Sequence, residues 1–149
     1  MHGIMIEIIK KSIISKWERD KLEVTSDKVQ SYLLEVKDAI CKGHYSIARN
    51  SNRQDNNDLF NDYVIDEEKA KEILLTIEVE DFSEVRYNEH KGYEHELLYI
   101  FGKEVKLLER WGSEETIVPL YIKFNKLENQ FVIVISFHRQ KHPMKYYFK

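Results

Sequence analysis

The sequence contains little of what marks several common classes of protein. It has one cysteine, two prolines and five glycines in 149 residues, which argues against a disulfide framework or a Pro/Gly-rich linker. The longest apolar run, residues 4–9, is interrupted by Glu7 and falls far short of the ~20 residues of a membrane helix. The N-terminus lacks the pattern of a secretory signal. A single Cys41, which we predict to be at least half-buried, fits a reducing cytoplasm, and we expect a cytoplasmic protein without membrane contact.

The motifs of several enzyme classes are also absent. The sequence has no Gly-rich phosphate loop, nucleophile elbow or dinucleotide fingerprint. Histidines occur at His90 and His95, each beside a glutamate, and at His138 and His142. A zinc site usually needs three or four converging ligands, and only one cysteine is present. We therefore expect no metal and no cofactor.

The composition is that of one folded domain with an uneven charge. Hydrophobic residues make up 42% and charged residues 33% of the chain, whose net charge is −3, so it can bury a core and is not disordered. Residues 1–116 contain 17 Lys and Arg against 25 Asp and Glu, a net −8, whereas residues 117–149 contain 6 against 1, a net +5. A basic C-terminal part can bind phosphate, while the acidic remainder would confine nucleic acid to that part. Basic tails are also common on proteins that bind no nucleic acid.

Helical periodicity is present at three places in the first half of the chain. Apolar residues at helical spacing predict an amphipathic helix within residues 4–17. A second helix is predicted from about Ser26 to a stop at Gly43, and Asp66 is placed to cap a third. The buried faces predicted for the second and third helices are Val29, Tyr32, Leu33, Val36 and Ile40, and Ala70, Ile73, Leu74 and Ile77.

Loops and strands account for the rest. The polar residues 50–58 and the aperiodic residues 83–96 are interpreted as loops. Strands are predicted at residues 97–101, 105–108, 117–124 and 131–137. The fold class is therefore α+β, a small antiparallel sheet of three or four strands packed against helices.

The last two strands allow a prediction of register. A two-residue turn at Asn129-Gln130 pairs positions whose numbers add up to 259. One face, predicted to meet the core, then holds Leu120, Ile122, Phe124, Ile133, Ile135 and Phe137. The opposite face holds Tyr121, Lys123, Ser136 and His138, with Tyr121 directly across from His138. An ordinary hairpin whose outer face is merely polar is the alternative interpretation.

These polar residues match what RNA cleavage without a metal requires. A base must activate the ribose 2′-hydroxyl, cations must stabilise the phosphate, and an acid must protonate the leaving 5′-oxygen. Histidine, with a reference pKa of ~6.5, can serve as base or acid near neutrality. We assign His138 as the candidate acid/base, Tyr121 as an orienting or proton-sharing group, and Lys123 with Arg139 as phosphate cations.

The C-terminal residues 137–149 alternate basic and aromatic side chains without one acid. Aromatic rings stack on unpaired bases and cations bind the backbone, so this segment suits single-stranded RNA. Its predicted RNA contacts are Lys141, Lys145 and Tyr146. Alternatively, the aromatic residues of this segment attach the C-terminus to the core, and both interpretations can hold.

Short motifs along the chain resemble MqsR-type toxins of toxin–antitoxin systems, which are mRNA interferases of the wider RelE-like class. The matching pieces, in order, are Lys42-Gly43-His44-Tyr45, Ile47-Ala48-Arg49, Asp66-Glu67-Glu68, Glu72-Ile73-Leu74-Leu75, Val79-Glu80-Asp81-Phe82, Ile100-Phe101-Gly102-Lys103-Glu104, Leu120-Tyr121-Ile122-Lys123, Ile135-Ser136-Phe137-His138 and His142-Pro143-Met144-Lys145-Tyr146-Tyr147-Phe148. Together they extend over roughly three quarters of the chain.

The resemblance implies a compact α+β toxin fold over residues 29–149, with residues 1–28 as a helical extension. It also implies an endoribonuclease that cleaves mRNA without metal and is neutralised by a cognate antitoxin protein. Tyr121 matches the strand tyrosine of the family, and His138 stands where the family has a lysine. A further family lysine has no exact equivalent, and Arg86 is the nearest cation; Lys103 is the nearest candidate for the family's glutamine. A non-catalytic RNA- or protein-binding module on the same fold is the alternative function.

Overall fold

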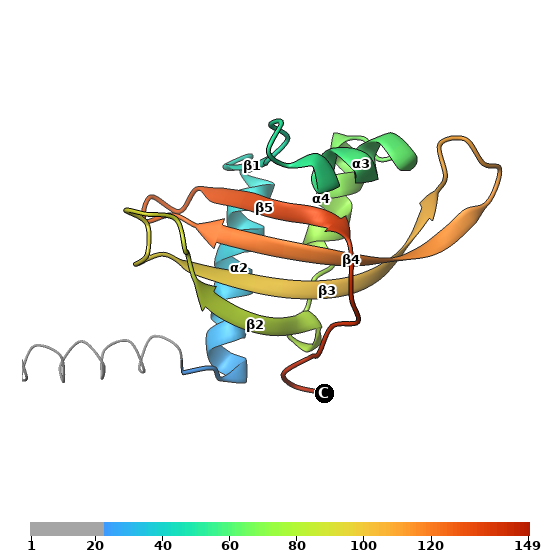
Figure 1. The fold of residues 1–149 in the computed structure, drawn as a ribbon. Coiled ribbons are helices and arrows are strands. Elements are labelled where there is room, and N and C mark those ends of the chain that lie inside the picture. Colours follow the sequence, from blue (N-terminus) through green and yellow to red (C-terminus); the bar gives the residue numbers. More distant parts are fainter. Residues whose placement is uncertain (1–22) are drawn as a thin grey trace, which may run out of the picture.

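Residues 23–149, the part of the chain that the computed structural model describes, form an α+β fold, as the sequence predicts (Figure 1). The helix predicted within residues 4–17 lies outside these described residues. None of the helices in residues 23–149 combines the length and the apolar composition that a membrane crossing needs. The elements are α2 (Ser26–Cys41), β1 (Tyr45–Ile47), α3 (Gln54–Asp62), α4 (Glu67–Leu75), the 3₁₀ helix η1 (Val79–Asp81), β2 (Phe82–Tyr87), β3 (Leu97–Leu108), β4 (Glu115–Lys126) and β5 (Val132–Arg139).

The capping residues explain where α2 and α4 begin and end. The Thr25 hydroxyl accepts a hydrogen bond from the backbone N–H of Lys28 at 3.1 Å, and α2 stops before Gly43, whose φ of +76° favours glycine. The Asp66 carboxylate accepts from the backbone N–H of Lys69 at 2.7 Å at the start of α4. All the residues predicted for the inner faces of these two helices are buried. Both predicted helices are confirmed.

The sheet has the strand order β1-β5-β4-β3-β2. The pairs β2–β3, β3–β4 and β4–β5 are antiparallel, whereas β1 pairs with β5 in parallel. The prediction of three or four antiparallel strands is therefore corrected to five strands in a mixed sheet. β1 has only three residues, too few to show alternation. β2 falls in the segment predicted as a loop, because an edge strand that is half-exposed can carry Ser83, Glu84 and Arg86 in place of apolar residues.

Helix α3 replaces most of the loop predicted over residues 50–58. Its sequence is rich in Asn and Asp, which are weak helix formers, and Leu59 is its only buried apolar residue. The helix lies along the edge of β5 (Figure 1), where Asn56 is 1% exposed. Tertiary contact, which periodicity does not report, accounts for this helix.

The core lies between one face of the sheet and helices α2 and α4 (Figure 1). Phenylalanines of three strands, Phe82, Phe101 and Phe124, are fully buried there, and the ring of Tyr32 on α2 stacks on Tyr99 of β3 at 3.7 Å between centroids. Cys41 is exposed at the end of α2, so the prediction that it is at least half-buried was wrong. Within residues 23–149, no helix covers the other face of the sheet, which the C-terminal segment crosses (Figure 1).

The β4–β5 hairpin departs from the predicted register twice. Its loop has three residues, 128–130, with Gln130 at a φ of +69°, so Lys126 pairs with Val132. A bulge then leaves Ile135 without a partner, since Phe124 pairs with Val134 and Lys123 pairs with Ser136. The prediction placed Ile133 and Ile135 in the core. In the structure Val132 and Val134 are fully buried there, and Ile133 and Ile135 are only half-buried. After the bulge the predicted pairs are restored.

Candidate active site

Tyr121 on β4 and His138 on β5 face each other, as the register argument predicts. Their rings stack with 5.1 Å between centroids and 12° between planes. Lys123, two residues along β4, pairs with Ser136 in the same way. Ile122, which lies between Tyr121 and Lys123 in the strand, is fully buried in the core. Because side chains alternate along a strand, the four polar residues therefore lie on the opposite face of the sheet.

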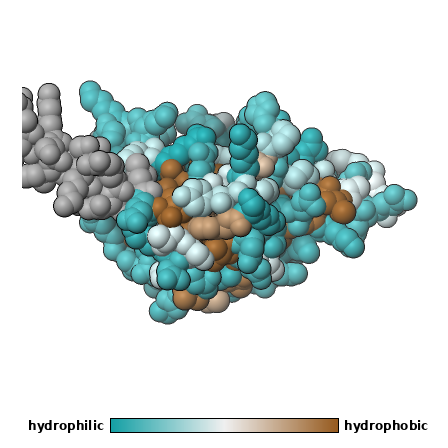
Figure 2. All heavy atoms as spheres, turned by 90° about the horizontal axis from the view of Figure 1, so that it is seen from below, coloured by the Kyte–Doolittle hydropathy of each residue, from teal (hydrophilic) through white to brown (hydrophobic). Residues whose placement is uncertain are grey.

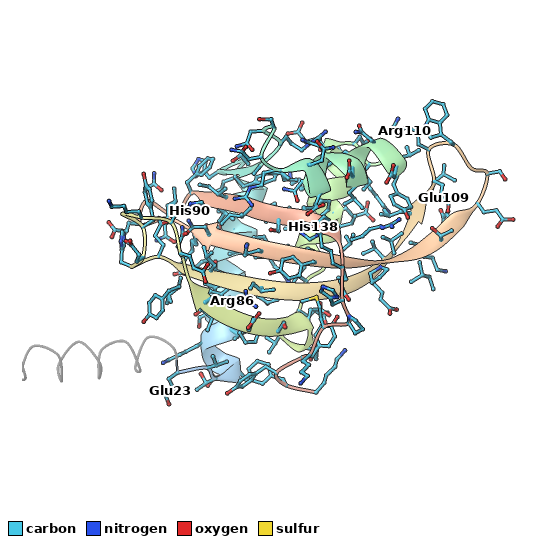
Figure 3. The ribbon with its side chains drawn as sticks, in the orientation of Figure 1. Glu23, Arg86, His90, Glu109, Arg110 and His138 are labelled. Atoms are coloured by element: carbon cyan, nitrogen blue, oxygen red, sulfur yellow. The ribbon has the colours of Figure 1, made fainter. Side chains whose placement is uncertain are left out.

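A cavity of about 600 Å³ opens on this face. Residues of β2, β4, β5 and the C-terminal segment line it, and Figure 3 shows Arg86 and His138 on opposite sides of the intervening strands. The lining residues are Ser83, Glu84, Arg86, Tyr121, Lys123, Ser136, His138, Lys141, His142, Pro143, Met144 and Lys145. Of the nine predicted site residues, six line this cavity.

The main chain fixes the tautomer of His138. Its Nδ1 lies 2.7 Å from the carbonyl oxygen of Arg139. A carbonyl oxygen can only accept, so Nδ1 carries the hydrogen and donates it. In the neutral ring Nε2 is then unprotonated and is available as a proton acceptor. The half-exposed ring is therefore set up to act as a base through Nε2.

The charges of two arginines act on Lys123. Burial lowers the pKa of its ammonium group, and the positive charges of Arg53 and Arg86 lower it further, against the opposing charge of Glu89. Arg53 directly precedes α3 and was not predicted as a site residue. The free ammonium is therefore poorly compensated, and an anion placed among these three cations would relieve the repulsion.

Tyr121 and Arg86 complete the predicted set within the cavity. Burial raises the pKa of the Tyr121 hydroxyl, so it stays protonated at neutral pH and can donate. The Arg86 guanidinium is bound to the Glu84 carboxylate at 2.5 Å. Because that pair is exposed, water screens it and a phosphate can compete for the guanidinium. Glu84 nevertheless lowers the net positive charge at this edge of the cavity.

Two predicted phosphate cations lie elsewhere. Arg139 donates to the Tyr63 hydroxyl at 3.2 Å and lines a different cavity, beside the acidic side of α3. Lys103 is bound to Asp81 at 3.1 Å, and it pairs with Leu120, on the core side of the sheet. His138 and Lys141 also line this second cavity, but neither Arg139 nor Lys103 lines the cavity that holds Tyr121 and Lys123. Alternation along β5 separates Arg139 from His138, its neighbour in sequence.

Two of the three RNA contacts predicted within residues 137–149 line the cavity. Lys141 lines the cavity and bridges to Asp55 of α3 at 2.7 Å. Lys145 also lines it, and its carbonyl accepts from the Ser83 hydroxyl at 2.6 Å. Tyr146 does not line the cavity; its hydroxyl lies 3.4 Å from the Gln140 side-chain nitrogen.

The C-terminal segment forms one wall of the cavity because Gly102 leaves room for it. Gly102 pairs with Tyr121, and a Cβ there would lie 2.5 Å from the Tyr146 hydroxyl and 2.7 Å from the Met144 sulfur. Further on, the backbone N–H of Tyr147 donates to the carbonyl of Phe82 at 3.0 Å. Phe148 packs on the core, so the aromatic residues do attach the C-terminus.

Sequence reasoning missed Arg53, whose charge acts on Lys123, and several residues that line the cavity. Arg53 gave no signal, because it lies in a segment interpreted as an exposed loop. Met144 and Pro143 belong to the C-terminal run but were not singled out. His142 was weighed only as a metal ligand, although its place four residues after His138 in a basic segment could have suggested it.

Asn56 holds the strand that carries His138. Its side-chain nitrogen donates to the carbonyls of Ile135 and Ala48 at 2.9 and 2.8 Å, and its oxygen accepts from the N–H of Phe137 at 2.8 Å. The bulge therefore has its outward backbone groups satisfied by one buried amide.

Among residues 23–149, no three His, Cys, Asp or Glu side chains gather closely enough to hold a metal ion. Comparison of the chain with protein-family models, with curated proteins and with solved structures finds no match.

Proposed function

We propose that this protein is a toxin-like endoribonuclease that cleaves single-stranded mRNA by acid/base chemistry without a metal. The observation that carries the proposal is the stacked Tyr121–His138 pair, whose histidine has Nδ1 bound to the main chain and Nε2 available, beside the cation Lys123. The resemblance to MqsR-type toxins supports it, since the quoted motifs contain all three residues.

The reaction is a transfer of the phosphoryl group to the neighbouring 2′-oxygen. His138 Nε2 accepts the proton of the ribose 2′-hydroxyl, and the resulting oxygen attacks phosphorus. The bond from phosphorus to the 5′-oxygen breaks, and that oxygen takes a proton from the protonated His138 or from the Tyr121 hydroxyl. The products are a 2′,3′-cyclic phosphate and a free 5′-hydroxyl. Lys123 and Arg86 stabilise the charge on the phosphate.

Cleavage of a long unstructured RNA under single-turnover conditions tests the proposal. His138→Ala should slow cleavage by about 10²–10⁴-fold, the usual contribution of an acid/base group, and should weaken RNA binding only slightly. Lys123→Ala should reduce both rate and binding. His44→Ala is the matched control, because this exposed histidine directly precedes β1 and does not line the cavity. Excess chelator should leave the rate unchanged, and the products should carry 2′,3′-cyclic phosphate.

The same experiment separates the enzyme from a binding module. The observation that favours a non-catalytic module is Glu84, which pairs with Arg86 at the cavity and reduces its positive charge. If the wild-type chain binds RNA and cleaves none, the module replaces the enzyme. A His138→Ala variant that melts normally and cleaves at the wild-type rate removes His138 from catalysis.

A cognate antitoxin is the proposed protein partner. A basic cavity on an otherwise acidic protein can be blocked by an acidic or apolar segment of an inhibitor. We expect expression of the chain alone to inhibit growth, and co-expression with the adjacent small gene product to relieve it and to give a stable complex. Harmless expression together with no complex would count against the toxin assignment.

A further inference from the structure

The β3–β4 hairpin extends past the rest of the sheet (Figure 1). β2 pairs with β3 only as far as Phe101 and β5 pairs with β4 only as far as Leu120, whereas β3 and β4 stay paired to Leu108 and Glu115. One side of this extension packs on the core through Leu107, which is buried. The other side, here termed the outer face of the hairpin, consists of Lys106, Leu108, Glu115 and Ile117, all of them exposed.

Apolar side chains on this hairpin are unusually exposed. Ile117 is 63% exposed, Leu108 is 39% exposed, and Trp111 in the turn is 90% exposed; Figure 2 shows hydrophobic surface at the hairpin end of the molecule. The turn is held in place, since the Arg110 guanidinium donates to three carbonyls at the end of α3 at 2.9 to 3.2 Å. A fixed apolar patch exposed to water is typical of an interaction surface.

The register arranges the outer face as two rows of two side chains. Lys106 pairs with Ile117, and Leu108 pairs with Glu115. Leu108 and Ile117 therefore lie on one diagonal of this arrangement, which is apolar. Lys106 and Glu115, with opposite charges, lie on the other diagonal. Neither Lys106 nor Glu115 has an ion-pair partner within the described part of the chain.

This pattern complements itself under a two-fold rotation about the apolar diagonal. Two copies packed face to face around that axis bring Leu108 onto Leu108 and Ile117 onto Ile117, and they bring Lys106 of each copy opposite Glu115 of the other. With strands about 4.8 Å apart and alternate residues about 6.8 Å apart, the strands of the two copies would cross at about 70°, close to the orthogonal packing of sheets. A two-fold axis parallel to the strands, or one perpendicular to them within the face, would instead place the charged residues of one copy opposite the apolar residues of the other.

We propose that the outer face of the hairpin binds a second copy of this chain in that two-fold arrangement. Nucleic acid suits the surface poorly, because Glu115 and the neighbouring exposed Glu104, Glu109 and Glu114 would repel phosphate. Two apolar side chains from each copy make a small interface, so we expect a weak dimer with a Kd in the range of about 10–100 µM.

Sedimentation velocity of the full chain, from about 2 µM to about 500 µM, tests the proposal. The wild type should pass from monomer to dimer, and Ile117→Lys should raise the Kd at least about tenfold by placing two charges at the apolar contact. Leu34→Lys is the matched control, because Leu34 is 59% exposed on α2 and should leave the Kd unchanged. A wild type that stays monomeric over the whole range overturns the proposal, as does an equal effect of the two variants.

A charge exchange tests the two-fold geometry itself. Lys106→Glu alone and Glu115→Lys alone each set like charges opposite one another twice in the dimer, so each should weaken it by about threefold or more. The two changes together restore opposite charges and should bring the Kd back to near the wild-type value. Thermal melting confirms that each variant is folded. A double variant as weak as the single ones overturns the proposed arrangement.

Discussion

The side-chain oxygen of Asn56 accepts a hydrogen bond from the backbone N–H of Phe137 at 2.8 Å, one residue before His138. The same amide also bonds the carbonyl of Ile135 at the bulge. β1 covers the edge of β5 only as far as Ile47, which pairs with Val134. Asn56 therefore takes over as the partner of that edge where the parallel strand ends, and α3 is fixed to the strand that carries the candidate base.

We predict that Asn56→Ala destabilises the protein by about 3 kcal/mol, because it leaves one buried N–H and two partly buried carbonyls without a partner. Loss of the bulge geometry should also lower any cleavage activity by shifting His138. Urea unfolding measures the stability. Asn61→Ala is the control, since Asn61 is exposed on the same helix, and it should change the free energy of unfolding by less than about 0.5 kcal/mol. Equal effects of the two variants would contradict the role given to Asn56.

Gly102→Ala should displace the C-terminal segment. The new Cβ would meet the ends of the Tyr146, Met144 and Gln140 side chains at 2.5 to 3.0 Å. We expect the free energy of unfolding to fall by about 1 kcal/mol. The cleavage rate should fall as well, because the displaced segment forms one wall of the cavity. Combining it with Tyr146→Phe removes the closest clashing atom and should recover part of both losses. Thermal melting and cleavage rates provide the measurements; no recovery in the double variant would contradict this account.

Arg86 and Arg139 should behave differently, although both were predicted to bind phosphate. Arg86→Gln should weaken RNA binding and lower the slope of log K against log salt by about one phosphate contact. Arg139→Gln should leave binding within about threefold, because its guanidinium is bound to Tyr63 away from the cavity. Binding titrations at several salt concentrations distinguish the two, and an equal loss in both variants would place RNA on both sides of β5.

Lys123→Met should stabilise the protein at neutral pH. The ammonium of Lys123 is half-buried beside Arg53 and Arg86, which lowers its pKa below the value in the unfolded chain. The unfolded state therefore holds the proton more tightly, and the wild type gains stability as the pH rises from the lowered pKa towards the ordinary lysine value. Because water still screens this group, we expect a gain of only about 0.5 kcal/mol for the variant at pH 7. Unfolding at pH 7 and in alkali should show this difference shrinking; a constant difference would contradict it.

The predicted pairing of Tyr121 with His138 is correct because two errors in the predicted register cancel. The loop after β4 is one residue longer than the predicted two-residue turn, and this shifts the pairing by one position. The bulge at Ile135 shifts it back. Neither feature has a signal in alternation alone, because a bulge depends on a partner, here Asn56, that lies 79 residues away in sequence.

The remaining differences between the predicted and the observed structure depend on how far apart in the sequence the interacting residues lie. Capping and periodicity act within a few residues, so α2 and α4 could be predicted. The polar α3 and the edge strands β1 and β2 depend on contacts with distant segments, and they were missed. Arg139 could have been set apart from His138 by alternation along β5, whereas Lys103 could not, because the register of β3 with β4 had not been predicted.

The C-terminal segment crosses the open face of the sheet at Gly102 (Figure 1), between the cavity of His138 and the outer face of the hairpin. It thus divides that face into a cavity rich in basic side chains and a hairpin surface on which Leu108 and Ile117 lie beside Lys106 and Glu115. A molecule seated on one of these surfaces does not have to displace a molecule seated on the other. The two surfaces share no residue, so a substitution in one leaves the residues of the other unchanged.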